Sequence, residues 1–281
     1  MKFEYIEVKT EQNIFLNGFH TTGGNKSCAI FIPGVSGNFM ENKFARVIGD
    51  VCIENNIDFL FAHNQGSFQI ANPPCIKGNG NLSSIMRGAA YEFFNDCIYD
   101  LDAWMKFVSN YENLYIVAHS LGCNKTLHYL QKTTPTNLKK IVLLAPEDLE
   151  TFRDIPEHKG LFEEATSNIE AGQPNKLLSK KFLGYCVMSS HTFYDFITNP
   201  KINNIPYKTP NGDMSALEKI TCPLFAVIGA EEDAKATEYM HKIANTVSDG
   251  KSMVIPDANH IFKNQEQTLA NKVIEFLTHH R

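Results

Sequence analysis

The chain has 281 residues, of which 43% are apolar and 20% charged, and its formal net charge at pH 7 is −5. This composition excludes a disordered chain, a collagen-like fibre and a coiled coil, and the length suits one large α/β domain or two small ones. No apolar run reaches the roughly 18 residues of a membrane span, and the first residues lack the apolar stretch of a signal peptide. The negative charge argues against nucleic acid, so we expect a cytoplasmic protein with neither a nucleic-acid partner nor a membrane span.

Eight short apolar segments predict β-strands. The first two have no helix between them, which predicts an antiparallel edge, and the later ones are the continuous apolar runs of a buried parallel sheet. Amphipathic stretches separate the later segments, so we expect a mostly parallel sheet of about eight strands with helices on both faces. The predicted strands are residues 3–8, 14–19, 28–32, 59–62, 114–117, 141–144, 224–228 and 252–255.

Helical periodicity appears in residues 91–108, in residues 124–132 and at the end of the chain. Two segments interrupt the alternation of strand and helix. Residues 64–88 are rich in Asn, Gly and Pro and predict a long loop without regular structure, at the ligand-binding edge of the sheet. Residues 148–207 predict a mostly helical lid, with helices at 161–171, 175–184 and 192–197. We expect this lid to be inserted into a single domain whose core is residues 1–147 and 208–281.

The cysteines and histidines show no metal-binding or redox pattern. The seven cysteines are widely spaced without a Cys-x-x-Cys pair, and His-Glu-x-x-His is absent. The glycine-rich turn after the third predicted strand lacks both common phosphate-binding patterns. We therefore expect no metal, no cofactor and mostly buried cysteines in a reducing compartment.

The strongest local motif is Leu-Tyr-Ile-Val-Ala-His-Ser-Leu-Gly-Cys at residues 114–123. An apolar strand runs into a tight turn, where a strained serine would project its hydroxyl from the sheet edge and leave room only for small neighbours. The motif resembles the Gly-x-Ser-x-Gly nucleophile elbow of the α/β-hydrolases, with Ala118 and Gly122 at the two glycine positions. The resemblance predicts Ser120 as the nucleophile. The alternative is a serine that only caps the helix beginning near Leu121.

A serine nucleophile needs a base, and the chain order in this family is serine, acid, histidine. His260 follows the last predicted strand, where the family has its catalytic histidine. We favour Asp233 as the acid that accepts the histidine Nδ1–H, with Glu232 as the second choice. Glu147 or Asp148, after the strand at 141–144, is the third choice. The acidic cluster at 231–233 also has a non-catalytic explanation, because acidic residues are favourable at the N-terminus of a helix.

The tetrahedral intermediate of acyl transfer needs two hydrogen-bond donors for its oxyanion. The resemblance implies the backbone N–H of Leu121 as one donor. Residues 33–37, Pro-Gly-Val-Ser-Gly, resemble the family's His-Gly-x-x-x-Gly turn, which implies the N–H of Val35 as the other. Pro33 stands where the family commonly has histidine. We expect four residues to contact the substrate: Gly34, His119, Phe193 and Phe196.

The resemblance implies an α/β-hydrolase fold and a serine hydrolase without cofactor, carboxylesterase-like (EC 3.1). The expected reaction is cleavage of an ester of a small, partly apolar substrate through an acyl-enzyme on Ser120, although thioesters and amides use the same apparatus. Residues 86–101 are similar to a poorly characterised subgroup with fungal members linked to siderophore ester or amide cleavage. An acyltransferase with the same triad and a non-catalytic scaffold that binds a small ligand are the alternative functions.

Overall fold

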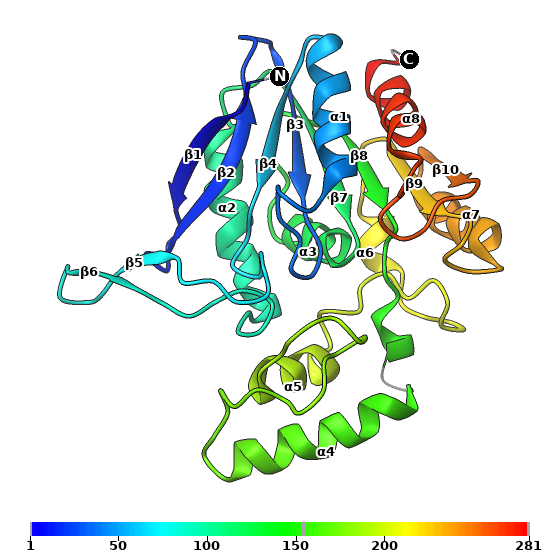
Figure 1. Ribbon diagram of the computed structural model, residues 1–281. Helices are drawn as coiled ribbons and strands as arrows, with labels where there is room; N and C mark the ends of the chain where they lie inside the picture. The colour runs from blue at the N-terminus through cyan, green and yellow to red at the C-terminus, as the bar shows by residue number, and fades with distance from the viewer. Residues whose placement is uncertain (1, 153–154, 280–281) are drawn as a thin grey trace.

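The apolar runs form one eight-stranded sheet in the order β1-β2-β4-β3-β7-β8-β9-β10. The computed structural model describes residues 2–152 and 155–279 (Figure 1). The strands β3, β4 and β7 to β10 pair in parallel, whereas β2 is antiparallel to both β1 and β4. All eight predicted strands and the antiparallel edge are confirmed. The strands are β1 (Glu4–Lys9), β2 (Phe15–Thr21), β3 (Ser27–Ile32), β4 (Ile57–Ala62), β7 (Asn113–His119), β8 (Leu138–Leu144), β9 (Leu224–Gly229) and β10 (Gly250–Ile255).

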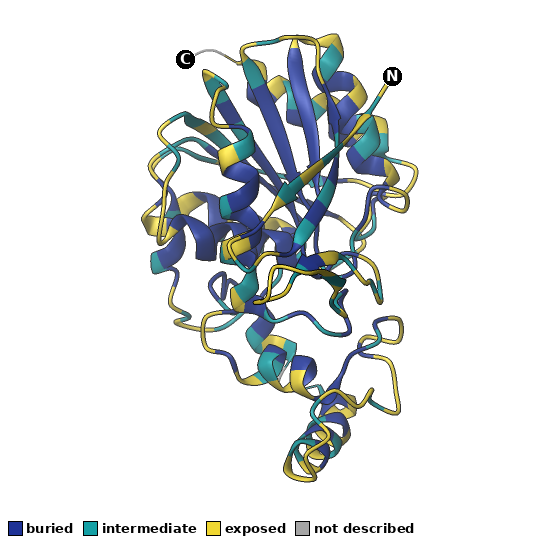
Figure 2. Ribbon diagram, turned by 90° about the vertical axis from the view of Figure 1, so that its left-hand side faces the viewer, coloured by how far each residue is buried: buried dark blue, intermediate teal, exposed yellow. Residues whose placement is uncertain are grey.

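Helices cover both faces of this sheet. Phe44 of α1 and Leu269 of α8 pack on one face, and Trp104 of α2, Leu127 of α3 and Met240 of α7 pack on the other. Because both faces are covered, the central strands are buried along most of their length (Figure 2), which is why they read as unbroken apolar runs. The helices are α1 (Lys43–Glu54), η1 (Phe94–Asp96), α2 (Cys97–Phe107), α3 (Leu121–Leu130), α6 (Ser215–Glu218), α7 (Ala236–Thr246) and α8 (Glu266–Thr278).

The cysteines behave as small apolar residues. All seven are unpaired and six of them are buried, as the sequence predicts. None of the helices among the described residues has the length and apolar character needed to cross a bilayer.

The loop that follows β4 contains a short hairpin, contrary to the prediction that residues 64–88 lack regular structure. Its strands are β5 (Pro74–Ile76) and β6 (Leu82–Ser84), paired antiparallel. The N–H of Lys77 donates to the carbonyl of Asn81 at 3.0 Å, which closes the turn between them. The hairpin is anchored to the sheet region because the N–H of Ile76 donates to the carbonyl of Asn13 at 2.9 Å.

Residues 148–207, the inserted segment, lie beyond the carboxyl ends of the parallel strands (Figure 1). The segment contains η2 (Leu149–Phe152), α4 (Pro156–Glu170) and α5 (Ser190–Thr198), which correspond to the helices predicted at 161–171 and 192–197. The helix predicted at 175–184 is wrong. Leu178 instead donates its N–H to the carbonyl of Met188 at 3.0 Å, and a turn at Leu183 and Gly184 has positive φ angles of 52° and 76°.

The inserted segment has an apolar core of its own that continues to the sheet edge. Phe182 and Phe193 are fully buried in this core, together with Phe196 of α5. The same cluster includes Leu121 at the start of α3 and, partly buried, Val35 after β3. The segment is therefore held against the two loops that the sequence analysis selected for the oxyanion.

Asp148 ties the beginning of the inserted segment to its end. Its carboxylate is fully buried and accepts the N–H groups of Lys208 at 2.6 Å and Thr209 at 2.9 Å. It also accepts the N–H of Glu150 at 3.2 Å. These partners are backbone N–H groups at both ends of the segment, and the hydroxyl of Thr209 also donates to Oδ2 at 3.2 Å. The carboxylate of Asp148 therefore has a structural role.

We expect Asp148→Ala to lower the free energy of unfolding by about 2–4 kcal/mol, because buried N–H groups lose a charged acceptor. Urea unfolding followed by circular dichroism measures the change. The matched control is Glu238→Gln on the exposed face of α7, which should leave the free energy of unfolding within about 0.5 kcal/mol of wild type. Equal stability of the two variants would contradict the structural role of Asp148.

Candidate active site

Ser120 occupies a strained turn between β7 and α3. Its backbone has φ 53° and ψ −130°, a conformation that residues other than glycine seldom adopt. The turn is held on both sides, since the N–H of Ser120 donates to the carbonyl of Leu144 at 2.9 Å and its carbonyl accepts the N–H of Cys123 at 2.8 Å. Ser120 is only partly exposed. This is the backbone geometry that the sequence analysis expected of a nucleophile elbow.

Two glycines permit the close approach of the loops around Ser120. A Cβ atom on Gly122 would lie 2.3 Å from the carbonyl oxygen of Ile32, so no larger residue fits between α3 and the end of β3. A Cβ atom on Gly34 would lie 2.7 Å from the Cβ and 3.1 Å from the Oγ of Ser120. Gly34 therefore lies directly against the side chain of Ser120, and its predicted contact with substrate stays a prediction.

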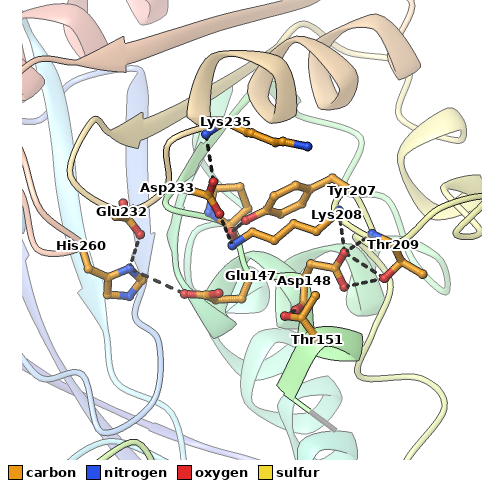
Figure 3. Close-up of polar contacts among 11 residues, drawn as sticks. Glu147, Asp148, Thr151, Tyr207, Lys208, Thr209, Glu232, Asp233, Lys235 and His260 are labelled. Carbon is orange, nitrogen blue, oxygen red and sulfur yellow. Dashed lines mark hydrogen bonds and ion pairs between the residues drawn. The ribbon is translucent and has the colours of Figure 1, made fainter. Parts of the chain in front are cut away.

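His260 lies on the loop after β10, and its ring is oriented by Glu232 (Figure 3). The Nδ1 atom of His260 lies 2.6 Å from Oε2 of Glu232, while Oε1 of Glu232 accepts the N–H of Gly229 at 3.1 Å. Burial, the largest influence, lowers the pKa of His260, but the hydrogen bond of Glu232 and the neighbouring carboxylates outweigh it and raise the pKa above its ordinary value. When the ring is neutral, the Glu232 carboxylate favours the tautomer that carries the proton on Nδ1.

The structure does not pair His260 with Asp233, so the predicted choice of acid is wrong. Asp233 points to Lys208, whose Nζ lies 3.2 Å from its Oδ2, and accepts the N–H of Lys235 at 2.9 Å (Figure 3). Burial raises the pKa of Asp233, but these two partners outweigh burial and hold the pKa below its usual value. The turn begins at Gly229, so the residue that reaches the histidine is Glu232, the second choice of the sequence analysis.

Glu147, after β8, supplies a second carboxylate beside the histidine. Its Oε1 lies 3.6 Å from Nδ1 of His260, too far for a hydrogen bond but close enough for a strong electrostatic interaction. Burial, together with the charge of Glu232, raises the pKa of Glu147 to about 7. Among the described residues, Glu147, Glu232 and His260 form the one group whose ligand atoms lie close enough, within 4.8 Å of one another, to hold a metal ion.

His119 supports the histidine loop from behind. Its Nε2–H donates to the carbonyl of His260 at 2.8 Å, and the two rings lie 4.9 Å apart. Burial, together with His260, lowers the pKa of His119 to about 3, so its ring is neutral. His119 is buried against Phe44 and Phe262, and this placement does not fit the predicted contact with substrate. The contact brings the His260 loop next to the elbow, although no hydrogen bond joins Ser120 Oγ to His260 among the described residues.

The two predicted oxyanion donors line one cavity. Leu121 is the first residue of α3, so its N–H has no acceptor inside the helix, and the N–H of Val35 donates to no protein acceptor among the described residues. Both residues border a narrow cavity of about 10 Å³, which Phe196 of α5 also lines. Phe193 is fully buried and does not line this cavity, contrary to its prediction as a substrate contact. The cavity is lined by Val35, Ala89, Glu92, Phe94, Leu121, Met188, Thr192, Asp195, Phe196 and Ile202.

A buried ion pair beside this cavity was missed by the sequence analysis. Lys125 of α3 is 1% exposed and pairs with Glu92, which borders the cavity. The feature that could have revealed this ion pair is a lysine in a helix that is buried on every side. Two buried charges so close to the elbow hold the wall of the cavity in one position, because separating them would leave a charge without a partner.

Comparisons with known proteins give one family match and several similar structures. The family described as serine hydrolase matches residues 98–182, which include the elbow. Among solved structures, the chain is similar to Est1E from Butyrivibrio proteoclasticus, with 12% identity, a TM-score of 0.62 and 97% of each chain covered. It is also similar to the Pyrococcus furiosus esterase Pf2001, with 14% identity, a TM-score of 0.58, and 98% of this chain and 90% of that chain covered. A thermophilic esterase from Thermogutta terrifontis has 13% identity, a TM-score of 0.58 and 98% of each chain covered.

No curated protein matched the sequence significantly. The structural matches nonetheless span almost the whole chain, with TM-scores of 0.58 to 0.62. The chain has the α/β-hydrolase fold, as the motif at Ser120 predicted.

We expect Gly34→Ala to reduce turnover on the order of 10²-fold, because the new methyl group displaces the Ser120 side chain that it would overlap. Turnover of a p-nitrophenyl ester and thermal unfolding measure activity and stability separately. Gly160→Ala, on the exposed face of α4 with no atom within 4 Å of the new Cβ, is the control and should change neither activity nor fold. Full activity of the Gly34 variant would place the reacting atoms elsewhere.

Proposed function

We propose that the protein is a serine hydrolase that cleaves an ester of a small, partly apolar substrate through an acyl-enzyme on Ser120. The observation that carries this proposal is the strained conformation of Ser120, which stands beside a histidine loop whose His260 is bonded to Glu232. Strain of this kind costs on the order of 1–3 kcal/mol and persists where the surrounding structure enforces it. The match of residues 98–182 to the serine hydrolase family and the similarity to esterase structures support the same reaction class.

In this mechanism, Nε2 of His260 accepts the proton of the Ser120 hydroxyl as Oγ attacks the ester carbonyl carbon. Glu232 accepts the Nδ1–H, which keeps Nε2 unprotonated before the attack and stabilises the imidazolium afterwards. The N–H groups of Val35 and Leu121 donate to the oxyanion. The imidazolium then protonates the leaving alcohol, and a water activated by the same histidine hydrolyses the acyl-enzyme. The hydrogen bond between Ser120 and His260 forms when substrate is bound, since such bonds are often long in free enzymes.

The cavity beside Val35 and Leu121 is the site we assign to the acyl group. Its mainly apolar lining suits a short acyl chain, on an ester or on a thioester or amide. Because its volume is only about 10 Å³, the lining side chains have to move apart to admit that chain. Phe196 contributes from the inserted segment, so residues 148–207 act as a lid on a core of residues 1–147 and 208–281. The reaction is then carboxylesterase-like, with the lid limiting the length of the acyl chain and excluding water.

Ser120→Ala should abolish labelling by a fluorophosphonate and reduce ester turnover on the order of 10⁴–10⁶-fold, because the attacking oxygen is lost. In-gel fluorescence of the labelled protein and p-nitrophenyl ester turnover measure the two effects. Thermal unfolding of the variant checks that the fold is kept. Labelling that persists in the alanine variant would assign the nucleophile to another residue.

Phe196→Ala should raise kcat/KM for long acyl chains relative to short ones by about tenfold or more, because it lengthens the acyl cavity. A series of p-nitrophenyl esters of increasing chain length gives this ratio. The matched control is Phe193→Ala, one turn away on α5, which should leave the ratio unchanged and lower the free energy of unfolding by about 3–5 kcal/mol. If Phe196→Ala also leaves the ratio unchanged, the inserted segment does not select the acyl group.

A further inference from the structure

Two carboxylates on loops that follow different strands of the sheet approach His260. Glu232 follows β9 and Glu147 follows β8, and both approach the same ring nitrogen, Nδ1, at 2.6 Å and 3.6 Å (Figure 3). The mechanism described above uses only Glu232. The carboxylate of Glu147 has no role in that mechanism. It lies beside Nδ1, whereas Nε2 is the ring nitrogen that accepts the proton of Ser120.

The two carboxylates are held in different ways. Glu232 is bound at both oxygens, one to His260 and the other to the N–H of Gly229. The Glu147 carboxylate accepts no hydrogen bond among the described residues, although its backbone carbonyl accepts one from the side chain of Asn124. Its oxygen needs to approach Nδ1 by less than about 1 Å to reach hydrogen-bond distance. Glu147 is therefore an unused acceptor within reach of the ring.

The other acidic residues nearby are committed elsewhere. Asp148 accepts the backbone N–H groups of Lys208 and Thr209, and Asp233 pairs with the Lys208 ammonium group. Neither belongs to the group of ligand atoms that converges around His260. This leaves Glu147 as the one carboxylate besides Glu232, among the described residues, in position to serve the histidine.

We propose that Glu147 is a positioning residue for His260, a second acceptor for the Nδ1–H that raises the basicity of the ring and replaces Glu232 when that carboxylate is lost. The proposal rests on the proposed function, in which His260 is the base for Ser120. During attack the ring becomes an imidazolium, and an anionic Glu147 stabilises it through space at 3.6 Å. No bond to Glu147 forms or breaks in this step.

The charge of Glu147 varies near neutral pH, because burial and Glu232 raise its pKa to about 7. A neighbouring anion favours the protonated ring, so ionised Glu147 raises the pKa of His260, which is the direction the structure has. Removing that carboxylate must lower the pKa of His260. At low pH, kcat/KM falls because the His260 ring becomes protonated, and this fall is the acid limb of the pH profile. With a lower pKa of His260, the acid limb must move to lower pH. The charged and titratable groups that act on or face Glu147 are His260, Glu232, Lys208, Asp148, Tyr207, Tyr185 and Cys123.

The experiment compares wild type with Glu147→Gln, Glu232→Ala, the double variant and Asp233→Asn, using p-nitrophenyl ester turnover from pH 5 to 9. Alanine is chosen at position 232 because a glutamine there would donate to Nδ1 and hold the wrong tautomer. Asp233→Asn is the matched control. Asp233 is an acid of the same turn, but it pairs with Lys208, so this variant should leave activity unchanged. Thermal unfolding checks that each variant is folded.

We expect Glu232→Ala to lose about 10–100-fold in kcat, because Glu147 moves in to accept the Nδ1–H. The double variant should lose on the order of 10³–10⁴-fold, the usual cost of a triad without its acid. Glu147→Gln alone should lose less than about tenfold and move the acid limb of the profile to lower pH. A folded Glu232→Ala variant as inactive as the double variant would overturn the proposal, as would an unmoved acid limb in Glu147→Gln.

An NMR titration of the His260 ring separates this proposal from the proposed function, since it needs no turnover. The resonance is assigned by its absence in His260→Gln. Glu147→Gln should lower the pKa of His260, whether or not the wild type hydrolyses esters or reacts with a fluorophosphonate. An unchanged pKa of His260 would overturn the role of Glu147 even in an active enzyme.

Discussion

The close approach of α3 to the loop after β3 is the constraint on which the site depends. Gly122 brings the first turn of the helix against the carbonyl oxygens of Ile32 and Pro33, at distances that admit no side chain. That contact keeps Ser120 in its positive-φ conformation, and Leu121 and Val35 line the same cavity beside it. A strained residue of this kind is stable only because two buried parallel strands on either side of it cannot move apart.

The rest of the site is assembled on neighbouring strands of the same edge. β8 and β9 end in loops that carry the two carboxylates, and β10 ends in the loop that carries His260. Neutral His119 links this last loop to the turn at Ser120 through the backbone of His260, so the residue that precedes Ser120 fixes the position of His260. Burial makes these interactions strong, and it also brings the pKa of Glu147 close to neutral pH.

The inserted segment has the opposite character, because it packs mostly on itself. Its aromatic core includes Phe182 and Phe193, and it touches the sheet edge through residues around Val35 and Leu121. Asp148 holds its two ends together with backbone hydrogen bonds. A segment anchored at both ends and packed over the turn at Ser120 can shape the cavity beside Val35 and Leu121 without altering the positions of Ser120 and His260.

The sequence by itself determined the sheet, its eight strands, the elbow at Ser120 and the position of His260, because buried parallel strands and a strained turn leave local patterns of apolar and small residues. It did not determine which acid reaches the histidine. Asp233 and Glu232 are adjacent in the chain, and the choice depends on where the turn after β9 begins and on Lys208, 25 positions earlier in the chain, drawing Asp233 away. The prediction of a helix at 175–184 was wrong because it also depended on tertiary contacts. The hydrogen bond between Leu178 and Met188 forms only in the folded segment. The approach of Glu147 to His260 likewise joins residues on strands far apart in sequence, and local patterns carry no record of such contacts because only tertiary packing creates them.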